Sequence, residues 1–490
     1  MSPTVPVRLT RLMAAARLTA AATVAGLLSA CATLGPDHAP PDTGPYASEA
    51  FVFGDPYGSQ MPLARWWTAF DDAELDRLIE RGLAENRTLT RAAANLQRAR
   101  AELGLARLER VPEDTVSASY LEARRASASS SEAGPGSGPA APAETLRYGQ
   151  LGVSALWELD LFGRIDRMIE SAAARAEASE AALADLQLVI IADIADAYVS
   201  LRGLYAQLRV ANENVENQQE TLALVRDLQA AGRATELDVQ QTRVQLANAD
   251  AVRPILQAAI AERTSQLAVL VGVTPAHLEP LIEAGAALPL IEGVIAAGDP
   301  AALLRRRPDI RERERILAAA TAEIGVNLAD AFPRLSLLGD VGFSSAGGGD
   351  LFGTNALNFA LGPQLSWSVL GLAGTRQRVA AARASAVMAF AEYEQAVLMA
   401  LAETETALAR QAQLQRRIAS LRDADAAAVS AADLARLRYE TGATDFLNVL
   451  DADRVRLDAA NQLAAARTEL ARAQVAVFRA LRAGSPPGQA

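Results

Sequence analysis

Hydrophobic residues recur along this chain with two different periods, and each period predicts one kind of element. From Leu183 to Leu208 they step by three or four residues, which is the seam of a coiled-coil helix. From Leu151 to Leu159 they alternate with mainly polar residues, as in a β-strand that has one apolar face. Proline and glycine separate these stretches and set the expected ends of the elements.

The same order of elements is expected twice. The first copy, 71–298, contains helices at 71–82 and about 86–111, a β-hairpin at about 113–160, a coiled-coil hairpin at about 163–271 and a link to 298. The second copy, 299–482, contains a helix from Pro308 to Ala331, a β-hairpin at about 334–369 and a coiled-coil hairpin at about 373–482. Residues 483–490 are expected to form a flexible tail.

Matching residues support an internal duplication. Trp157 and Trp367 lie 210 residues apart, whereas Pro112 and Pro333 lie 221 apart, so the offsets differ by 221 − 210 = 11 residues. A Ser/Gly/Pro-rich run at 126–143 supplies the extra residues of the first copy. Because a repeated unit usually buries its apolar face against its twin, we expect one pseudo-symmetric body.

The four predicted strands have two different faces. Leu, Val, Phe and Trp share one face, and Ser, Gly, Gln, Asn and Asp share the other. A soluble sheet packed on the helices would explain one such hairpin, but two in an exported chain favour strands of an outer-membrane barrel. Four strands cannot enclose a pore, and open edges are not tolerated in lipid, so we expect several chains to share one barrel.

The N-terminus is typical of a lipoprotein export signal. Residues 1–30 combine three arginines with a short apolar run from Leu18 to Ser29, too short to span a bilayer. Cys31, the only cysteine, follows Leu-Ser-Ala, which resembles a lipobox. We expect lipidation of Cys31, a lipid anchor in the outer membrane and an extended tether over 31–70. The alternative is an incidental cysteine beside a secretory cleavage site.

Charge and composition exclude several classes of function. The net charge is −11, and all 47 basic residues are arginines without a long basic run, so a nucleic-acid partner is not expected. The chain has two histidines, His38 and His277, in separate regions, so we expect no metal site and no cofactor. No nucleophile and base stand in a catalytic pattern, and the chain is not expected to be an enzyme.

Three motifs carry a resemblance to a known family. They are Trp66-Trp67-Thr68-Ala69-Phe70-Asp71, Leu303-Leu304-Arg305-Arg306-Arg307-Pro308-Asp309-Ile310, and Tyr439-Glu440-Thr441-Gly442 followed by Leu450-Asp451-Ala452. With them the chain resembles the outer membrane factor family, the TolC-like channels, and in particular its NodT-type lipoprotein branch.

The resemblance implies a mainly α fold with a membrane β-barrel part. Long antiparallel coiled-coil helices would form a periplasmic α-barrel, and four transmembrane strands per chain would enter a barrel shared by a homotrimer. The expected partners are a periplasmic adaptor, an inner-membrane pump of the resistance-nodulation-division type, and outer-membrane lipid. Together they would export drugs or other small molecules. The alternatives are a lipid-anchored coiled-coil scaffold without a pore, and the duct of a protein-secretion system.

The resemblance also assigns a periplasmic aperture. Leu447, Asn448, Asp451 and Arg454 share one face of the last helix. By resemblance, Asp451 would form an acidic ring, Leu447 an apolar constriction, and Arg454 a salt-bridge partner. On the residues alone, an ordinary solvated ion pair on a helix face explains this pattern better, and only the family match favours the aperture.

Two further pairs are expected at the helix tips. Gly232 and Gly442 fit the left-handed turns that tight helical hairpins need. By resemblance, Tyr439 just before the second tip would bind Asp238 on the first hairpin as a latch. Thr444 stands where some relatives have a basic residue, which leaves that part of the latch open.

Overall fold

The computed structural model describes residues 33–42, 44–46, 50–54, 57, 64–125, 144–283, 285–293, 295–346 and 350–483. Several expectations lie outside these residues: the signal peptide over 1–30, Cys31, the Ser/Gly/Pro-rich run at 126–143 and the tail after 483.

The helices lie where the hydrophobic pattern predicts them, apart from two short ones, Pro275–Leu278 and Pro300–Arg306, which were not predicted. Those of the first copy are α2 (Ala73–Glu85), α3 (Arg87–Leu108), α4 (Arg164–Ala230) and α5 (Glu236–Val271). The short α6 (Pro275–Leu278) and α7 (Pro300–Arg306) follow, and then α8 (Pro308–Ala329), α9 (Leu372–Glu440) and α10 (Phe446–Ala480). Asp72 caps α2 because its Oδ1 accepts hydrogen bonds from the backbone N–H groups of Glu74 and Leu75, at 2.9 and 3.0 Å.

The described chain divides into two compact units, each built from parts of both copies. The sheet unit lies within 1–40, 97–177 and 314–391, and the hairpin unit within 41–96, 178–313 and 392–490. The repeat boundary near residue 298 is therefore not a boundary between compact bodies. The physical reason is that strands and helices of one copy pack against those of the other.

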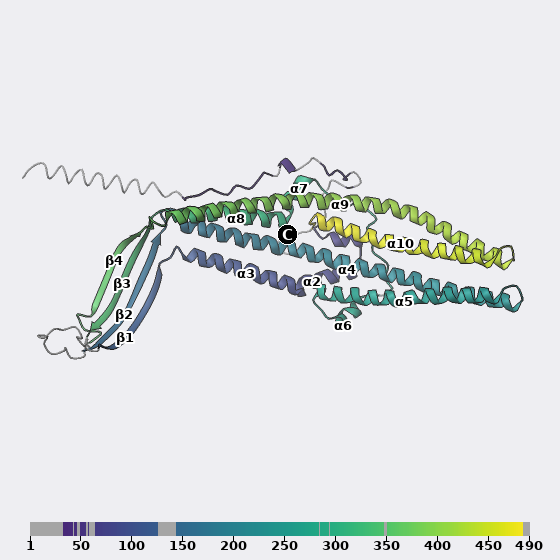
Figure 1. Cartoon of the computed structure of the whole chain (residues 1–490), viewed down its shortest axis with the longest axis horizontal. Helices are drawn as coiled ribbons and strands as arrows, with labels where there is room; N and C mark the ends of the chain where they lie inside the picture. Colours follow the sequence, from purple (N-terminus) through teal and green to yellow (C-terminus); the bar gives the residue numbers. More distant parts are fainter. Residues whose placement is uncertain are drawn as a thin grey trace, which may run out of the picture. The chain divides into compact units, whose positions relative to one another are not determined.

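The sheet unit holds four antiparallel strands in the order β1 (Glu113–Arg125), β2 (Glu144–Leu159), β3 (Arg334–Ala346) and β4 (Leu357–Ser366) (Figure 1). Their register aligns side chains in rows across the sheet. One row is Val116, Val153, Val341 and Phe359, and the next is Ser117, Gly152, Gly342 and Asn358. The predicted apolar and polar faces are thus confirmed. Val116 and Phe359 are 69% and 78% exposed, so the described residues do not cover the apolar face.

Two tryptophans mark equivalent places at the sheet. The indole Nε1 of Trp157 donates to the carbonyl oxygen of Arg110 at 3.0 Å, and that of Trp367 to Ala331 at 3.1 Å. The two donors lie 210 residues apart in the sequence and the two acceptors 221 apart. These are the two offsets of the duplication, so the two contacts are equivalent in the two copies. The prediction that the last strand reaches about residue 369 was wrong, because β4 ends at Ser366. The Trp367 side chain instead contacts Ala331, just after the end of α8.

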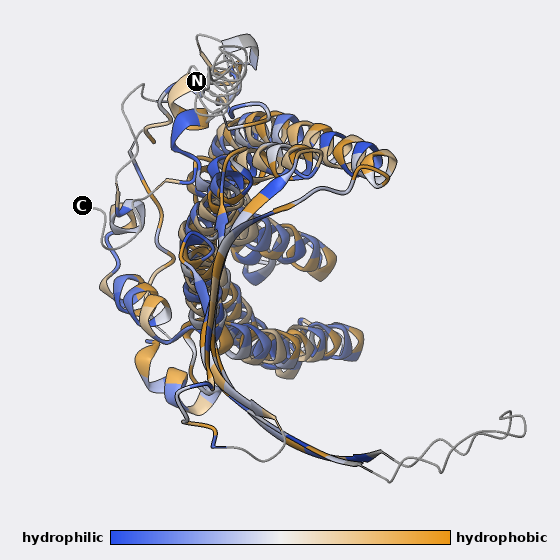
Figure 2. Ribbon diagram, turned by 90° about the vertical axis from the view of Figure 1, so that its left-hand side faces the viewer, coloured by the Kyte–Doolittle hydropathy of each residue, from blue (hydrophilic) through white to orange (hydrophobic). Residues whose placement is uncertain are grey.

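The hairpin unit has a continuous apolar core. Ile190, Ile194 and Leu201 of α4 are 6%, 0% and 0% exposed, which confirms the heptad seam. Trp66 stacks on Phe478 of α10 at 4.8 Å between ring centroids, so the segment before α2 packs against the last helix. In Figure 2 the helices show alternating hydrophilic and hydrophobic stretches, as expected for helices with one buried face.

A buried arginine joins the ends of several helices in the hairpin unit. Arg307, between α7 and α8, is 2% exposed and donates two hydrogen bonds to Asp309 at 3.0 and 2.6 Å. It also donates to the carbonyl oxygen of Ala480 at the end of α10, at 2.9 Å. Burial raises the pKa of Asp309, but the hydrogen bonds and charge of Arg307 outweigh it and hold that pKa below its ordinary value. The arginine-rich motif therefore has a structural role.

Candidate functional site: the helix tips and an adjoining polar cavity

The two helical hairpins end in equivalent turns. Gly232 and Gly442 have φ of +73° and +74°, a conformation that strains any residue with a Cβ atom. At the first tip the N–H of Arg233 donates to Leu228 O, and at the second the N–H of Ala443 donates to Arg438 O, both at 2.7 Å. These bonds close the last turn of α4 and of α9, as in a Schellman cap.

A small apolar core holds the two tips together. It consists of Leu222, Val225, Val239, Tyr439, Phe446 and Val449, all less than 9% exposed. The rings of Tyr439 and Phe446 lie 5.2 Å apart. Because these residues come from all four long helices, the tips form one packed end.

The predicted aperture residues lie on the outer face of α10. Leu447 is 65% exposed, and the side chains of Asp451 and Arg454 are 72% and 80% exposed with 3.5 Å between their charged atoms. Asn448 donates to Thr444 Oγ1 at 2.9 Å. Within this chain the Asp451–Arg454 pair is worth only about 0.3–0.5 kcal/mol because solvent screens it. No described residue of the hairpin unit covers the face.

The expected hydrogen bond between Tyr439 and Asp238 is not formed. The Asp238 carboxylate instead accepts two hydrogen bonds at the start of its own helix. The backbone N–H and the hydroxyl of Thr235 donate them, each at 2.8 Å. The Tyr439 hydroxyl is buried without a hydrogen-bond partner. Burial, followed by the nearby charge of Asp238, raises the pKa of Tyr439. The local capping box at the start of α5 therefore competes with the latch.

Another residue joins the two tips instead. Arg233 lies at the first tip, between α4 and α5. Its Nη2 donates a hydrogen bond of 2.7 Å to the carbonyl oxygen of Glu440, where α9 ends. A cation at a helix C-terminus also interacts favourably with the helix dipole. This contact could not be predicted from the sequence, because Arg233 lies 207 residues from Glu440 and belongs to none of the three motifs.

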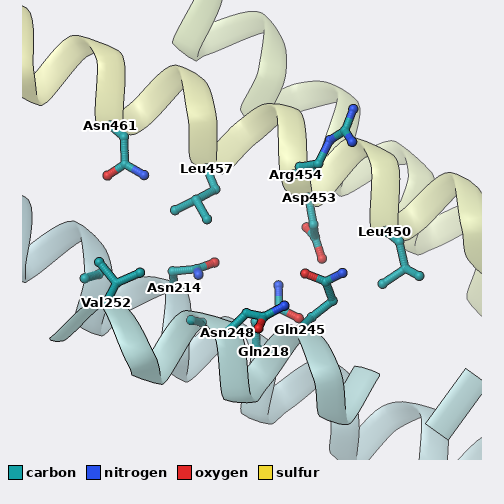
Figure 3. Close-up of a pocket in the computed structure, with 12 residues that line it drawn as sticks. Asn214, Gln218, Gln245, Asn248, Val252, Leu450, Asp453, Arg454, Leu457 and Asn461 are labelled. Carbon is teal, nitrogen blue, oxygen red and sulfur yellow. The ribbon is translucent and has the colours of Figure 1, made fainter. Parts of the chain in front are cut away.

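Behind the aperture face lies a polar cavity of about 250 Å³ between α4, α5 and α10 (Figure 3). Asp453 projects into it and is 4% exposed, and Asn214 and Gln218 reach it from α4. One side-chain oxygen of each of these three residues is buried without a hydrogen bond from the protein. Gln245 and Asn248 of α5, together with Arg454 and Asn461 of α10, complete the polar lining.

The buried carboxylate of Asp453 is flanked by two arginines. Its oxygens lie 3.8 Å from Arg436 and 3.9 Å from Arg456, too far for strong hydrogen bonds. Burial raises the pKa of Asp453, and the charges of Arg436 and Arg456 only partly offset that rise. The sequence carried a signal for this site, since Asp453 follows Phe446 and Val449 in steps of three and four on the buried face.

The N-terminal segment is held against the sheet unit. Leu34 N–H donates to Phe162 O at 3.2 Å, and Arg167 donates to Leu34 O at 3.0 Å and to Asp37 at 2.7 Å. His38 lies 2.5 Å from Glu314 of α8. Leu34, three residues beyond Cys31, is thus bound where β2 ends and α4 begins.

Among the described residues, no helix is long and apolar enough to cross a membrane.

Comparison with known proteins gives a consistent result. Nodulation protein T of Rhizobium leguminosarum bv. viciae is 30% identical over 465 residues, which cover 95% of this chain and 93% of that protein. Outer membrane protein OprJ of Pseudomonas aeruginosa is 31% identical and covers 88% of each chain. Among solved structures, the outer-membrane channel OprN matches with a TM-score of 0.85 and 39% identity, over 92% of this chain and 99% of that chain.

The fold and the relatives define an outer-membrane efflux channel subunit with a long periplasmic part. The sequence profile of the outer membrane efflux protein family matches residues 78–273 and 300–482, and the chain belongs to that family. The resemblance inferred from the three motifs is therefore confirmed. Of these relatives, OprN is an outer-membrane channel and OprJ an outer membrane protein.

Proposed function

We propose that three copies of this chain form a passive export duct, in which twelve strands close a barrel through the outer membrane. The observation that supports this most is the sheet itself. Apolar rows run across all four strands on an exposed face, and within the described chain β1 and β4 pair on one side only. Lipid accepts the apolar face but not the open edges, so neighbouring copies must pair with them. The number three follows the family resemblance.

The lipid anchor fits the same membrane level. Thr33 packs closely against Gly163. A Cβ atom at that glycine would lie only 2.7 Å from Thr33 Cα. Two chain links span at most about 7 Å, so a lipid on Cys31 would start close to the junction of β2 and α4. Acyl chains there would enter the leaflet next to the barrel and add to its anchoring.

At the tips of the long hairpins, the exposed face of α10 would line the periplasmic aperture. Three copies of Asp451 would form a ring of carboxylates, with Leu447 as an apolar constriction and Asn448 and Arg454 beside it. Such a ring attracts cations and disfavours anions. Arg233, rather than the pair Tyr439 and Asp238, would hold each protomer's tips together in the state described here.

In the cell the duct would act within a tripartite pump. A periplasmic adaptor and an inner-membrane pump of the resistance-nodulation-division type would deliver drugs or other small molecules to it. The name of one relative supports a role in an efflux pump: TtgC of Pseudomonas putida is a probable efflux pump outer membrane protein, 31% identical over 86% of this chain. The adaptor and the type of pump follow the family resemblance.

The aperture is tested by single-channel conductance of the purified mature protein in planar bilayers. Replacing both Asp451 and Arg454 by Ala should raise the conductance of the resting channel. The control removes Arg417 and Glu469, an ion pair 3.2 Å apart whose side chains are 50% and 45% exposed and which lies away from the tips. Equal conductance of the wild type, the variant and the control would contradict the aperture assignment. Native mass spectrometry of the same sample should give a trimer.

A further inference from the structure

A groove in the hairpin unit has the size of a ligand site. It lies between α4, α9, α10 and the segment 285–290, and its volume is about 720 Å³. Cavities of roughly 300–1,000 Å³ are typical of small-molecule sites in proteins. The groove is distinct from the polar cavity that contains Asp453, although both touch α4 and α10.

The groove is positively charged in a chain whose net charge is −11. Its lining includes four arginines but only two acidic residues, Glu213 and Asp425. Arg209 pairs with Glu213 at 3.8 Å. That pair leaves three arginines and one carboxylate to account for.

These three arginines lack good acceptors within the described chain. The guanidinium groups of Arg422 and Arg467 make no ion pair and no hydrogen bond with the described residues. Neither of them pairs with Asp425. Arg456 reaches Asp453 only at 3.9 Å, and its Nη2 is buried without a hydrogen bond. A buried N–H donor without an acceptor is costly, so an anion that accepts from Arg456 would stabilise the groove.

Most of the rest of the lining is apolar, with Tyr205 and Asn212 as the exceptions. Leu288 and Leu290 line one side from the segment 285–290, and Leu463 lines it from α10. Arginine pairs with carboxylate or phosphate through two parallel hydrogen bonds, whereas the leucines favour hydrocarbon. We propose that this groove binds an amphipathic organic oxyanion, with its carboxylate or phosphate on Arg422, Arg456 and Arg467 and its apolar body against the leucines.

Isothermal titration calorimetry on the full mature protein in a neutral detergent tests the proposal. The probes are 1-naphthyl phosphate and 1-naphthoate, compared with inorganic phosphate and with 1-naphthylmethylammonium. Both naphthyl anions should bind saturably, inorganic phosphate at least tenfold more weakly, and the cation not at all. The double variant Arg422→Gln/Arg467→Gln should lose at least tenfold in affinity for both anions. Arg416→Gln, an exposed arginine of α9 outside the groove, should bind as the wild type does.

Other results would overturn the proposal. Equal binding of the cation and the anions would show simple partition into detergent or apolar surface. Equal binding of inorganic phosphate and 1-naphthyl phosphate would show that the leucines contribute nothing. Unchanged affinity in the double variant, with the oligomer and helix content of the wild type, would exclude Arg422 and Arg467 as the anion-binding groups.

Discussion

Replacing Arg233 by Ala should loosen the helix tips. The change removes the 2.7 Å hydrogen bond from the guanidinium to Glu440 O and a positive charge at the C-terminus of α9. A hydrogen bond of this kind contributes about 0.5–1.5 kcal/mol, and a cation at an exposed helix end about 0.3–1 kcal/mol. Because both terms describe one solvent-exposed contact, we expect a loss of about 1 kcal/mol, which is roughly fivefold in the opening equilibrium of the tip.

Hydrogen exchange with mass spectrometry measures this opening directly. Backbone amides over 438–449 should exchange roughly fivefold faster in Arg233→Ala than in the wild type, and Arg233→Lys should lie between them. Arg226→Ala is the matched control, because Arg226 is an exposed arginine of α4 without an ion pair among the described residues. If Arg233→Ala and Arg226→Ala exchange at the same rate, the contact with Glu440 does not hold the tips together.

Three further changes test other parts of the account. Burial raises the pKa of Asp453, so the closed tip favours the protonated, neutral carboxyl group. This group therefore stabilises the closed tip at low pH, and the contribution is lost as the pH rises through the raised pKa. Hydrogen exchange over 446–460, corrected for the intrinsic rate, should therefore be slower at about pH 4 than at about pH 8, and this difference should vanish in Asp453→Asn. An equal difference in the wild type and in Asp453→Asn would contradict this role of Asp453. Arg307→Ala removes the charged hydrogen bonds to Asp309 and leaves that carboxylate with only Arg482, at 3.8 Å, so it should cost about 1.5–3 kcal/mol of unfolding free energy, visible as a lower thermal midpoint, whereas exposed Arg305→Ala should leave the midpoint unchanged. Val341→Arg on the apolar face should cost about 2–4 kcal/mol and reduce assembly into outer membranes in fractionation, while Ser344→Arg on the other face should assemble normally.

Much of the fold follows from local sequence patterns. The period of apolar residues located every long helix and all four strands, and Gly232 and Gly442 marked the tips because few other residues tolerate a positive φ. The compact units did not follow from the same patterns. Their composition depends on which strand and helix of one copy meets the other, which is a tertiary property.

The contacts of the tips show a similar limit. The capping box of Thr235 and Asp238 is a local motif and could have been read from the sequence, and it explains why the Asp238 carboxylate is occupied. The burial of Asp453 was also readable from its place on the apolar seam of α10. The bond from Arg233 to Glu440 was not, because it exists only once two turns 207 residues apart meet in space.

The central claim is that one face of the sheet meets lipid and the other meets water. Nitroxide labels placed singly at 339–344 of β3, with accessibility to oxygen and to a water-soluble nickel chelate measured in bilayers, test it most directly. The account predicts alternation: oxygen should reach 339, 341 and 343, and the chelate should reach 340, 342 and 344. Equal access of the chelate to both sets would contradict the account, because the apolar face would then lie in water.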